Sequence, residues 1–419
     1  MKKKVWILNH HANSMYFDEG GRHYNIAKYL KEKGYEPVIF CSNACHGNNK
    51  IYFEDLKLWQ EHWAEKIQVP FIYVAGRPYV GNGKNRILCM LDYYKNVKKV
   101  AVEYAKRNGK PDIIIGSSVH PLAVLAAEQL ARKFHVKCIA EFRDLWPESI
   151  VAMGIAKKTN PIVVALRMLE KKLYIDANAI VFTVPGGYDY ITERKWDKQI
   201  AKDNVFYINN GVDLEAYMRN IEENVLVDKD LEDQNCFKVI YAGSIRRANG
   251  LTELVDGADI LKNNGKLKFI IYGTGDYEKE LKQKVQDNGQ SNVVFKGKVE
   301  KKYIPYILSC SDLNILNYNA VAAAGFFRFG SSQNKLFEYF ASGKPVLSNF
   351  QTNYDLIQEY KCGVSRELPN AQQYAEAIEE FINLDKRDYE QMCGNALRAA
   401  QDFDFKEHTN EYINIIEQV

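Results

Sequence analysis

The sequence predicts an α/β protein made of two doubly wound domains that face each other across a cleft. Short apolar runs rich in β-branched residues alternate with amphipathic stretches of helical spacing along the whole chain. This alternation is typical of parallel sheets covered by helices on both faces. A chain of 419 residues exceeds one ordinary core, so we expect two domains of about 200 residues each and a binding site between them.

The alternation runs through the first half, pauses, and then restarts. Strands are expected in the first half at Val5–Leu8, Pro37–Cys41, Asp112–Gly116, Lys137–Glu141 and Ala179–Thr183, with helices such as Tyr24–Lys33 and Leu122–Phe134. A last strand is expected within residues 204–213, and the acidic stretch Glu222–Gln234 is interpreted as a linker. Strands then resume at Phe237–Ala242, Lys268–Tyr272, Asn292–Lys296, Asp312–Leu316 and Pro345–Ser348.

We therefore divide the chain into an N-terminal Rossmann-like domain at 1–212 and a C-terminal Rossmann-like domain at 213–400. Residues 401–419 are expected to form a helix that packs back toward the N-terminal domain.

Composition and charge exclude several classes of protein. A formal net charge of +3 argues against an obligate nucleic-acid partner. The eight cysteines lack the repeated close pairs of a zinc module or a secreted scaffold, so we interpret them as reduced thiols and expect no bound metal. The apolar run at the start ends at Asn9, too early for a signal peptide, and no segment is long enough to span a bilayer. A cytoplasmic protein is expected, with at most peripheral membrane contact.

Ligands of open α/β sheets collect beyond the carboxyl ends of the strands, where loops and helix N-termini offer N–H groups to anions. Three such segments occur in the second half: 241–250, 272–275 and 330–345. In the first, Gly243 lets the backbone approach a ligand, and Arg246 and Arg247 offer positive charge to phosphate oxygens. A solvated turn with surface arginines is the alternative. Gly273 belongs to the second segment, where a lone Gly-x-Gly commonly forms just a tight turn.

The third segment carries the most information. Ser331 or Ser332 is expected to cap a helix that presents Lys335 and Glu338 on one face. The lysine and the helix N-terminus suit a diphosphate, and the carboxylate suits the hydroxyl groups of a ribose. An exposed ion pair within the helix is the alternative interpretation.

The run from Asn334 to Val346 resembles the donor-site signature of glycosyltransferase family 4, the retaining enzymes of the GT-B fold. The resemblance extends to Gly20-Gly21 with the following helix, to Ile208–Asp213 and to Val293–Asn317. The run Glu141–Pro147 resembles the "RDLWP" branch, whose transferases build O-antigen, capsule and exopolysaccharide.

The resemblance assigns roles to individual residues. Glu338 takes the place of the glutamate that binds the ribose. The family's other glutamate falls at Gly330, and its phosphate-binding arginine and lysine fall at Ser244 and Asn249. Arg246, Arg247 and Lys335 are nearby substitutes. The donor-binding set implied by the resemblance is Gly21, Gly243, Gly273, Lys298, Ser331, Ser332, Asn334, Lys335 and Glu338.

The first half offers further candidates for the acceptor side of the cleft. Gly20 and Gly21 open a helix whose N-terminus suits a phosphate, although a tight turn explains either glycine alone. His120 follows a strand and is a candidate for polarising an acceptor hydroxyl or contacting the donor, with a structural histidine as the alternative. Arg143 and Asp144 are candidates for orienting a substrate, or else form a structural ion pair.

Residues 84–110 contain eight basic and two acidic side chains. Apolar residues lie among them at roughly helical spacing: Leu88, Leu91, Tyr94, Val97, Val100 and Val102. Such a helix suits an anionic membrane surface carrying a lipid-linked acceptor. A helix that packs on the core and exposes a basic side is the alternative.

These observations lead us to expect a retaining transferase that moves a sugar, from a UDP-sugar, to a growing and lipid-linked envelope glycan. His120, Arg246, Arg247 and Lys335 are the candidate catalytic residues, and no metal is expected. Two alternatives are a nucleotide-sugar epimerase on the same fold and a degenerate subunit that binds without turnover. An NAD-dependent oxidoreductase is disfavoured because no strand is followed by Gly-x-Gly-x-x-Gly with a later acidic partner.

Overall fold

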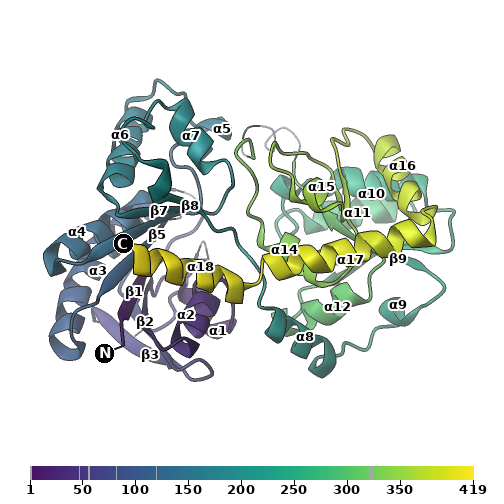
Figure 1. The fold of residues 1–419 in the computed structure, drawn as a ribbon. Coiled ribbons are helices and arrows are strands. Elements are labelled where there is room, and N and C mark those ends of the chain that lie inside the picture. Colours follow the sequence, from purple (N-terminus) through teal and green to yellow (C-terminus); the bar gives the residue numbers. More distant parts are fainter. Residues whose placement is uncertain are drawn as a thin grey trace. The chain divides into compact units, whose positions relative to one another are not determined.

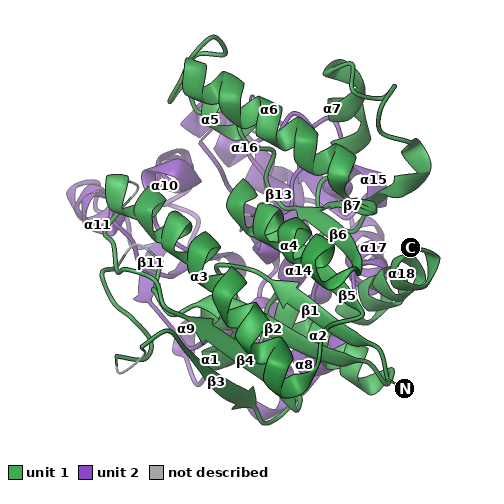
Figure 2. Cartoon of the chain, turned by 90° about the vertical axis from the view of Figure 1, so that its left-hand side faces the viewer, with its two compact units in different colours: residues 1–209, 405–419 green, residues 210–404 purple. Residues whose placement is uncertain are grey.

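The protein consists of two compact α/β units, seen here in a computed structural model (Figure 1). The structure describes residues 2–46, 48–54, 57–81, 83–118, 120–319, 325 and 327–419. Unit 1 contains residues 1–209 and 405–419, and unit 2 contains residues 210–404 (Figure 2). The boundary lies three residues before the expected one at 212/213, and the C-terminal helix α18 (Phe405–Gln418) belongs to unit 1.

Unit 1 is built on an eight-stranded sheet with the order β3-β4-β2-β1-β5-β6-β7-β8. Every neighbouring pair is parallel except β3 and β4, which are antiparallel. The strands are β1 (Lys4–Leu8), β2 (Glu36–Ser42), β3 (Trp59–Ala64), β4 (Val69–Val74), β5 (Ile113–Ser118), β6 (Lys137–Phe142), β7 (Ala179–Phe182) and β8 (Val205–Tyr207).

Helices cover both faces of this sheet, because strands such as β1 carry buried apolar residues on both sides. Val5 and Ile7 pack in a core with residues of α2 (Arg22–Glu32) and α18, while Trp6 and Leu8 pack with α3 (Lys84–Asn108) and α4 (Pro121–Phe134). The remaining helices are α1 (Asn13–Phe17), α5 (Glu148–Ala152), α6 (Pro161–Asp176) and α7 (Gly187–Glu193).

The basic helix α3 packs on the core through its apolar side. Val97 and Val100 are fully buried there together with Tyr93 and Tyr104. Two of the apolar residues that suggested a membrane-facing surface are therefore part of the core. The expectation fails for those two positions because apolar residues have the same helical spacing whether they face a membrane or the protein core.

Unit 2 is built on a six-stranded parallel sheet with the order β11-β10-β9-β12-β13-β14. Its strands are β9 (Phe237–Ala242), β10 (Leu267–Tyr272), β11 (Val293–Gly297), β12 (Leu313–Leu316), β13 (Val346–Ser348) and β14 (Gly363–Ser365). Its helices are α8 (Leu214–Glu223), α9 (Lys229–Glu232), α10 (Thr252–Ile260), α11 (Glu278–Asp287), α12 (Ile304–Ser309), α14 (Asn334–Ala341), α15 (Leu356–Tyr360), α16 (Ala371–Ile382) and α17 (Lys386–Asp402).

The acidic stretch Glu222–Gln234 is part of unit 2 and does not link the units, so the linker interpretation is wrong. Leu231 is buried in the core of unit 2. Asp230 binds Lys268 at 2.7 Å and Lys296 at 2.6 Å, and Asp228 binds Lys296 at 2.7 Å. The acidic residues that suggested a solvated linker instead neutralise lysines of β10 and β11.

Candidate functional site

The loops after β9 and β10 touch each other, and glycines make this possible. A Cβ on Gly273 would lie 1.7 Å from the carbonyl oxygen of Gly243, and Gly273 has a φ of +132°. A Cβ on Gly275 would lie 2.0 Å from the carbonyl oxygen of Ile245. Gly273 and Gly275 are therefore required by the close approach of two backbones, whatever ligand binds beside them.

Lys335 reaches from the first turn of α14 to the end of β9. Its ammonium donates to the hydroxyl oxygen of Tyr241 at 3.1 Å and lies 4.5 Å from the centre of the Tyr241 ring. A Cβ on Gly243 would lie 3.1 Å from the same ammonium. The structure thus brings Lys335 and Gly243, two of the predicted donor-site residues, to one point.

The charge of Lys335 is partly buried and has no carboxylate within ion-pair distance among the described residues. Burial lowers the pKa of Lys335 to about 8, and Glu338 on the next turn counteracts this only in part. A cation held in this way gains from an anionic ligand that replaces its lost hydration.

The N-terminus of α14 differs from the prediction. Gln333 occupies the N-cap position, and neither Ser331 nor Ser332 caps the helix. The side chain of Gln333 makes no capping hydrogen bond, so the first N–H groups of the helix lack a side-chain cap. The hydroxyl oxygen of Ser332 and the amide nitrogen of Gln333 are buried without a hydrogen-bond partner in the part of the chain that the structure describes. Beside Lys335 there are thus several unused donors.

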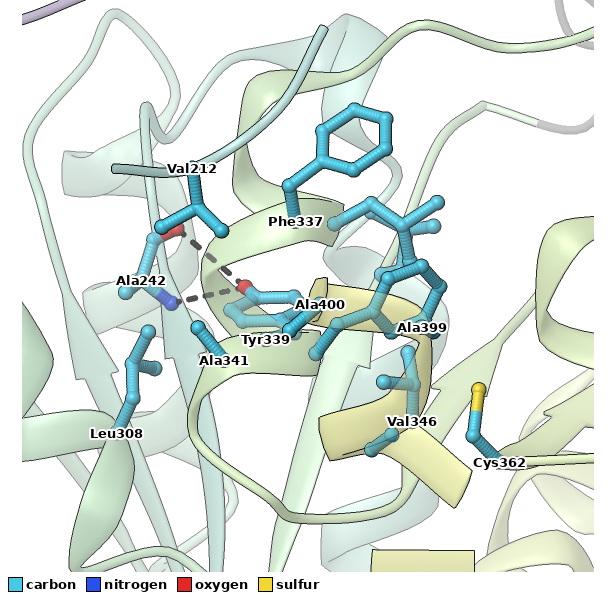
Figure 3. Close-up of a cluster of buried hydrophobic side chains, with 14 of the residues drawn as sticks. Val212, Ala242, Leu308, Phe337, Tyr339, Ala341, Val346, Cys362, Ala399 and Ala400 are labelled. Atoms are coloured by element: carbon cyan, nitrogen blue, oxygen red, sulfur yellow. Dashed lines mark hydrogen bonds between the residues drawn. The ribbon is translucent and has the colours of Figure 1, made fainter. Parts of the chain in front are cut away.

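Glu338 lies one turn after Lys335 and remains accessible, with 26% of its side chain exposed. Lys301 approaches its carboxylate to 3.9 Å. The adjacent Tyr339 is buried and fixes the helix, because its hydroxyl lies 3.3 Å from the nitrogen and 3.4 Å from the oxygen of Ala242 at the end of β9 (Figure 3). The position of Glu338 is therefore set by the buried side chain of the next residue in the helix.

The two arginines of the first loop are exposed and less closely tied to this point. Arg247 donates to Glu280 at 2.8 Å and lies over the Tyr277 ring at 4.4 Å, whereas Arg246 is exposed. An exposed ion pair of this kind is weak, so Arg247 can exchange Glu280 for a ligand at little cost. Lys298, just after β11, is exposed, as is Asn334 at the start of α14.

Gly330 occupies the position where the resembling family carries a glutamate. Its φ is +107°, a conformation that residues with a side chain rarely adopt. The local backbone thus suits glycine, and a glutamate could not be restored there without strain.

In unit 1, histidines gather at the carboxyl ends of β1 and β5. His120 is the N-cap residue of α4, and its Nε2 lies 3.0 Å from Nδ1 of His10. The ring of His11 lies 4.4 Å from that of His10 and 5.3 Å from that of His46, centre to centre. Sequence analysis identified only His120, because the other three histidines carry no pattern that links them.

Three of these histidines, His10, His11 and His120, are uncharged near neutral pH. Burial, helped by Arg86, lowers the pKa of His120 to about 3, and burial lowers the pKa of His10 and His11 well below the usual value. Nδ1 of His120 and both ring nitrogens of His11 are buried without a hydrogen-bond partner among the described residues. Neutral imidazoles with unused nitrogens can donate to or accept from a hydroxyl.

A second group in unit 1 was not predicted. The Arg22 side chain, directly after Gly21, donates to Glu141 at 2.7 Å and to the carbonyl of Ile208 at 2.8 Å. His23 binds the other oxygen of Glu141 at 3.0 Å, and Tyr412 of α18 donates to Glu141 as well. Burial alone would raise the pKa of Glu141, but Arg22 and His23 hold it well below its usual range.

Gly21 is the N-cap residue of α2, with a φ of +98°, so this glycine is required by the backbone. Gly20 precedes it without such a constraint. Arg143 and Asp144 follow β6, where burial lowers the pKa of Arg143 and raises that of Asp144. Nε of Arg143 is buried and lacks a partner within the described ranges.

Among the described residues, no group of three or more histidine, cysteine or acidic side chains is arranged as a metal site, and no helix could cross a membrane.

Two Rossmann-like units, each built on a largely parallel sheet, define the architecture of GT-B proteins. Family profiles agree: "Glycosyltransferase Family 4" matches residues 22–216, and "Glycosyl transferases group 1" matches residues 222–399. The chain belongs to the glycosyltransferases of the GT-B fold.

Individual relatives are distant. A probable glycosyltransferase of Pseudomonas aeruginosa, WbjE, is 20% identical over 289 residues, which is 68% of this chain and 70% of WbjE. Anabaena HepE in complex with UDP superposes with a TM-score of 0.68 at 16% identity, over 100% of both chains. Sucrose-phosphate synthase of Thermosynechococcus elongatus superposes with a TM-score of 0.71 at 14% identity, over 100% of this chain and 99% of the synthase. These structural likenesses show the fold.

Proposed function

We propose that the protein transfers a sugar from a UDP-sugar to a lipid-linked glycan of the cell envelope, with retention of anomeric configuration. The observation that carries this proposal is the uncompensated ammonium of Lys335 beside Gly243 and the uncapped N-terminus of α14. A cation and free N–H groups at one point suit a diphosphate, which UDP-, GDP-, dTDP- and ADP-sugars all contain.

UDP is the nucleotide that the structural relatives favour. HepE was solved with UDP and with UDP and glucose, and a trehalose-6-phosphate structure from E. coli was solved with UDP-2-fluoro glucose. We assign the ribose to Glu338, whose accessible carboxylate can accept hydrogen bonds from both hydroxyl groups. Lys335 and Ser332 would then contact the diphosphate, with Arg246 and Arg247 as further cations.

The proposed chemistry, including retention, follows from the resemblance to glycosyltransferase family 4. The bond between the anomeric carbon and the diphosphate oxygen breaks, and the acceptor hydroxyl oxygen forms the new bond on the same face of the sugar. The acceptor proton passes to the leaving diphosphate, so no separate protein base is required. Lys335 stabilises the charge that grows on that diphosphate, which is the electrostatic contribution that speeds such reactions most.

We further propose that protein cations neutralise the diphosphate without a metal ion. One of the two pairs of unit 2 with Asp-x-Asp spacing, Asp228 and Asp230, is already bound to Lys296 and Lys268. A metal would have to displace these lysines. On the acceptor side, His120 offers a neutral Nδ1 that can position a hydroxyl. Arg143, Asp144 and the α2 N-terminus at Gly20-Gly21 are the other candidates there.

The acceptor follows from the resemblance of Glu141–Pro147 to enzymes of O-antigen, capsule and exopolysaccharide synthesis. The enzyme would be cytoplasmic and would meet this lipid-linked acceptor at the inner face of the plasma membrane.

The test has two stages. Thermal unfolding with UDP-, GDP-, dTDP- and ADP-sugars should show the largest stabilisation with a UDP-sugar, because a ligand that binds the folded state raises the melting temperature. The preferred donor is then incubated with envelope lipids, and a glycosylated lipid is the expected product. Conversion of the donor to an isomer without acceptor would indicate an epimerase, and binding without turnover on any extract would indicate a non-catalytic subunit.

A further inference from the structure

The outer face of helix α6 in unit 1 is apolar, the reverse of an ordinary surface helix. Seven residues of α6 are exposed, and only Lys172 among them is charged; the others are Pro161, Ile162, Val164, Ala165, Met168 and Ile175. Ile162 is 70% exposed and Met168 is 71% exposed. A soluble helix normally presents polar residues at such positions, so this face is built for contact with something apolar.

The apolar surface continues into the segment before α6. Met153 and Ile155 are 47% and 71% exposed. Of the sixteen exposed large apolar side chains in the described part of the chain, six lie between residues 153 and 175. Such side chains are therefore concentrated here and not scattered. We call residues 153–175 with this exposed face the α6 patch.

Basic residues border the α6 patch. Between residues 153 and 175 there are five basic side chains and one acidic side chain, giving a formal charge of +4. The basic ones are Lys157, Lys158, Arg167, Lys171 and Lys172. The acidic one, Glu170, is 2% exposed and binds Tyr174 and Tyr190 inside the unit. Lys172 pairs with Asp176, the last residue of α6, at 2.6 Å, and Arg167 pairs with Glu148 at 2.8 Å. The positive charge of this surface therefore comes mainly from Lys157, Lys158 and Lys171.

Helix α6 packs on α4, and α4 packs on α3. The three helices form one layer over the sheet of unit 1 (Figure 2). The exposed lysines of α3, including Lys95, Lys99 and Lys106, therefore belong to the same layer as the α6 patch. Their apolar neighbours Val97 and Val100 are buried, so α3 can contribute charge while α6 supplies the apolar surface.

We propose that the α6 patch docks on an anionic lipid bilayer, with Ile162 and Met168 entering the boundary between head groups and acyl chains. Apolar residues between lysines match a surface with an apolar interior and negative head groups. A second copy of the chain fits less well, because a symmetric contact would set the same basic residues against each other. Vesicle binding requires no transferase activity, so this inference stands or falls independently of the proposed reaction.

The experiment is co-sedimentation of the full chain with vesicles of phosphatidylcholine, alone or with 30% phosphatidylglycerol as a chosen composition. We expect binding to the anionic vesicles that weakens with salt, and at least tenfold less binding for Ile162→Glu/Met168→Glu. The control Val225→Glu/Val227→Glu adds the same charge at exposed apolar positions of unit 2 and should bind like the wild type. Lys95→Gln/Lys99→Gln/Lys106→Gln should weaken binding less than the α6 variant and reduce its salt dependence.

Hydrogen exchange locates the contact directly. Anionic vesicles should protect residues 153–175 more than any segment of unit 2, and thermal unfolding of the α6 variant without vesicles should match the wild type. Unchanged vesicle binding by the α6 variant, or no protection of this segment, would overturn the proposal. So would a wild-type dimer in light scattering that Ile162→Glu/Met168→Glu converts to a monomer, because a second copy would then cover the patch.

Discussion

The ammonium of Lys335 donates to the hydroxyl of Tyr241 at 3.1 Å, and it lies 4.5 Å from the centre of the Tyr241 ring. A phenol ring attracts a cation but does not cancel its charge. The lysine is thus held in place beside Gly243, at the end of β9, while it keeps its capacity to bind an anion. Its lowered pKa makes that capacity depend on pH near neutrality.

The first prediction concerns the pH dependence of UDP binding. Burial lowers the pKa of Lys335 from 10.5 to about 8, and a bound diphosphate should raise it again because it favours the charged form. Affinity should therefore be full below pH 8 and fall above it, by up to about tenfold per pH unit, until the pKa of the complex is reached. Calorimetric titration with UDP between pH 7 and 9.5 measures this.

Lys335→Arg is the matched control for this prediction. Arginine keeps its charge throughout that range, so only the titration of uridine itself should remain in its profile. Wild-type and Lys335→Arg profiles of the same shape would show that Lys335 does not contact the diphosphate.

The second prediction is that Glu338→Ala weakens UDP binding and leaves the fold intact. The accessible carboxylate would lose charge-assisted hydrogen bonds to the ribose without leaving a cavity in the core. The expected loss is about 1.5–3 kcal/mol, or roughly tenfold to a hundredfold in affinity. Titrations with UDP and with 2′,3′-dideoxy-UDP should show that the variant no longer distinguishes the two.

Lys301→Ala provides the control, because it removes the 3.9 Å approach to Glu338 and keeps the carboxylate. It should change UDP affinity by less than about threefold, as exposed ion pairs contribute little. Equal affinity of wild type and Glu338→Ala for UDP, with unchanged melting temperatures, would remove Glu338 from the site.

The alternation of strands and helices was sufficient to predict most strands of the two sheets, including the edge strands β8 and β11, but β3, β4 and β14 were not among the expected strands. Strands β3 and β14 lie at sheet edges, where burial is incomplete and the apolar pattern is weak; β3 has one fully buried residue in six. The segment at 222–234 was misinterpreted for a related reason. Its acidic residues predicted a solvated segment, because only the fold brings Lys268 and Lys296 next to them.

The candidate site also contains residues that the sequence could identify and residues that it could not. Lys335 and Glu338 could be found because helical spacing places them on adjacent turns. Gln333 could not be identified as the N-cap residue from the sequence, since Ser331 and Ser332 are better capping residues. Which residue takes the N-cap position depends on the path of the chain. Arg22 and Glu141 lie 119 positions apart, and no spacing rule relates them. Buried ion pairs of that kind depend on the topology that joins α2 to β6.

The third prediction concerns stability. Glu141→Gln should lower the free energy of unfolding at pH 7 by about 3–5 kcal/mol, because it leaves the buried Arg22 without its carboxylate. The pKa of Glu141 is held well below its usual range, so its contribution is fully present above the unfolded value of about 4.3. The contribution disappears as the pH falls through the lower, folded value. Urea unfolding of both proteins at pH 7 and at pH 3 measures the difference, which should shrink at pH 3.

Glu417→Gln is the control, since Glu417 of α18 binds Lys3 at 2.6 Å on the surface of the same unit. Its unfolding should resemble that of the wild type at both pH values. A Glu141→Gln protein as stable as the wild type would show that the buried Arg22–Glu141 pair does not stabilise unit 1.

The fourth prediction is turnover without added metal. Lys335, the N–H groups at the start of α14 and the exposed arginines of the first loop provide positive charge for the diphosphate. If they neutralise the leaving group, neutral replacement of Lys335, Arg246 or Arg247 should lower the rate even with saturating donor, because the charge grows toward the transition state. A variant that changes only the apparent donor affinity would indicate uniform binding of ground state and transition state.

The deciding measurement is product formation by the wild-type enzyme after exhaustive chelation, with UDP-sugar and native acceptor supplied. Activity that chelation abolishes, and that Mg²⁺ or Mn²⁺ alone restores, would contradict this mechanism and would direct attention to Asp228 and Asp230, the acidic pair that lysines now occupy.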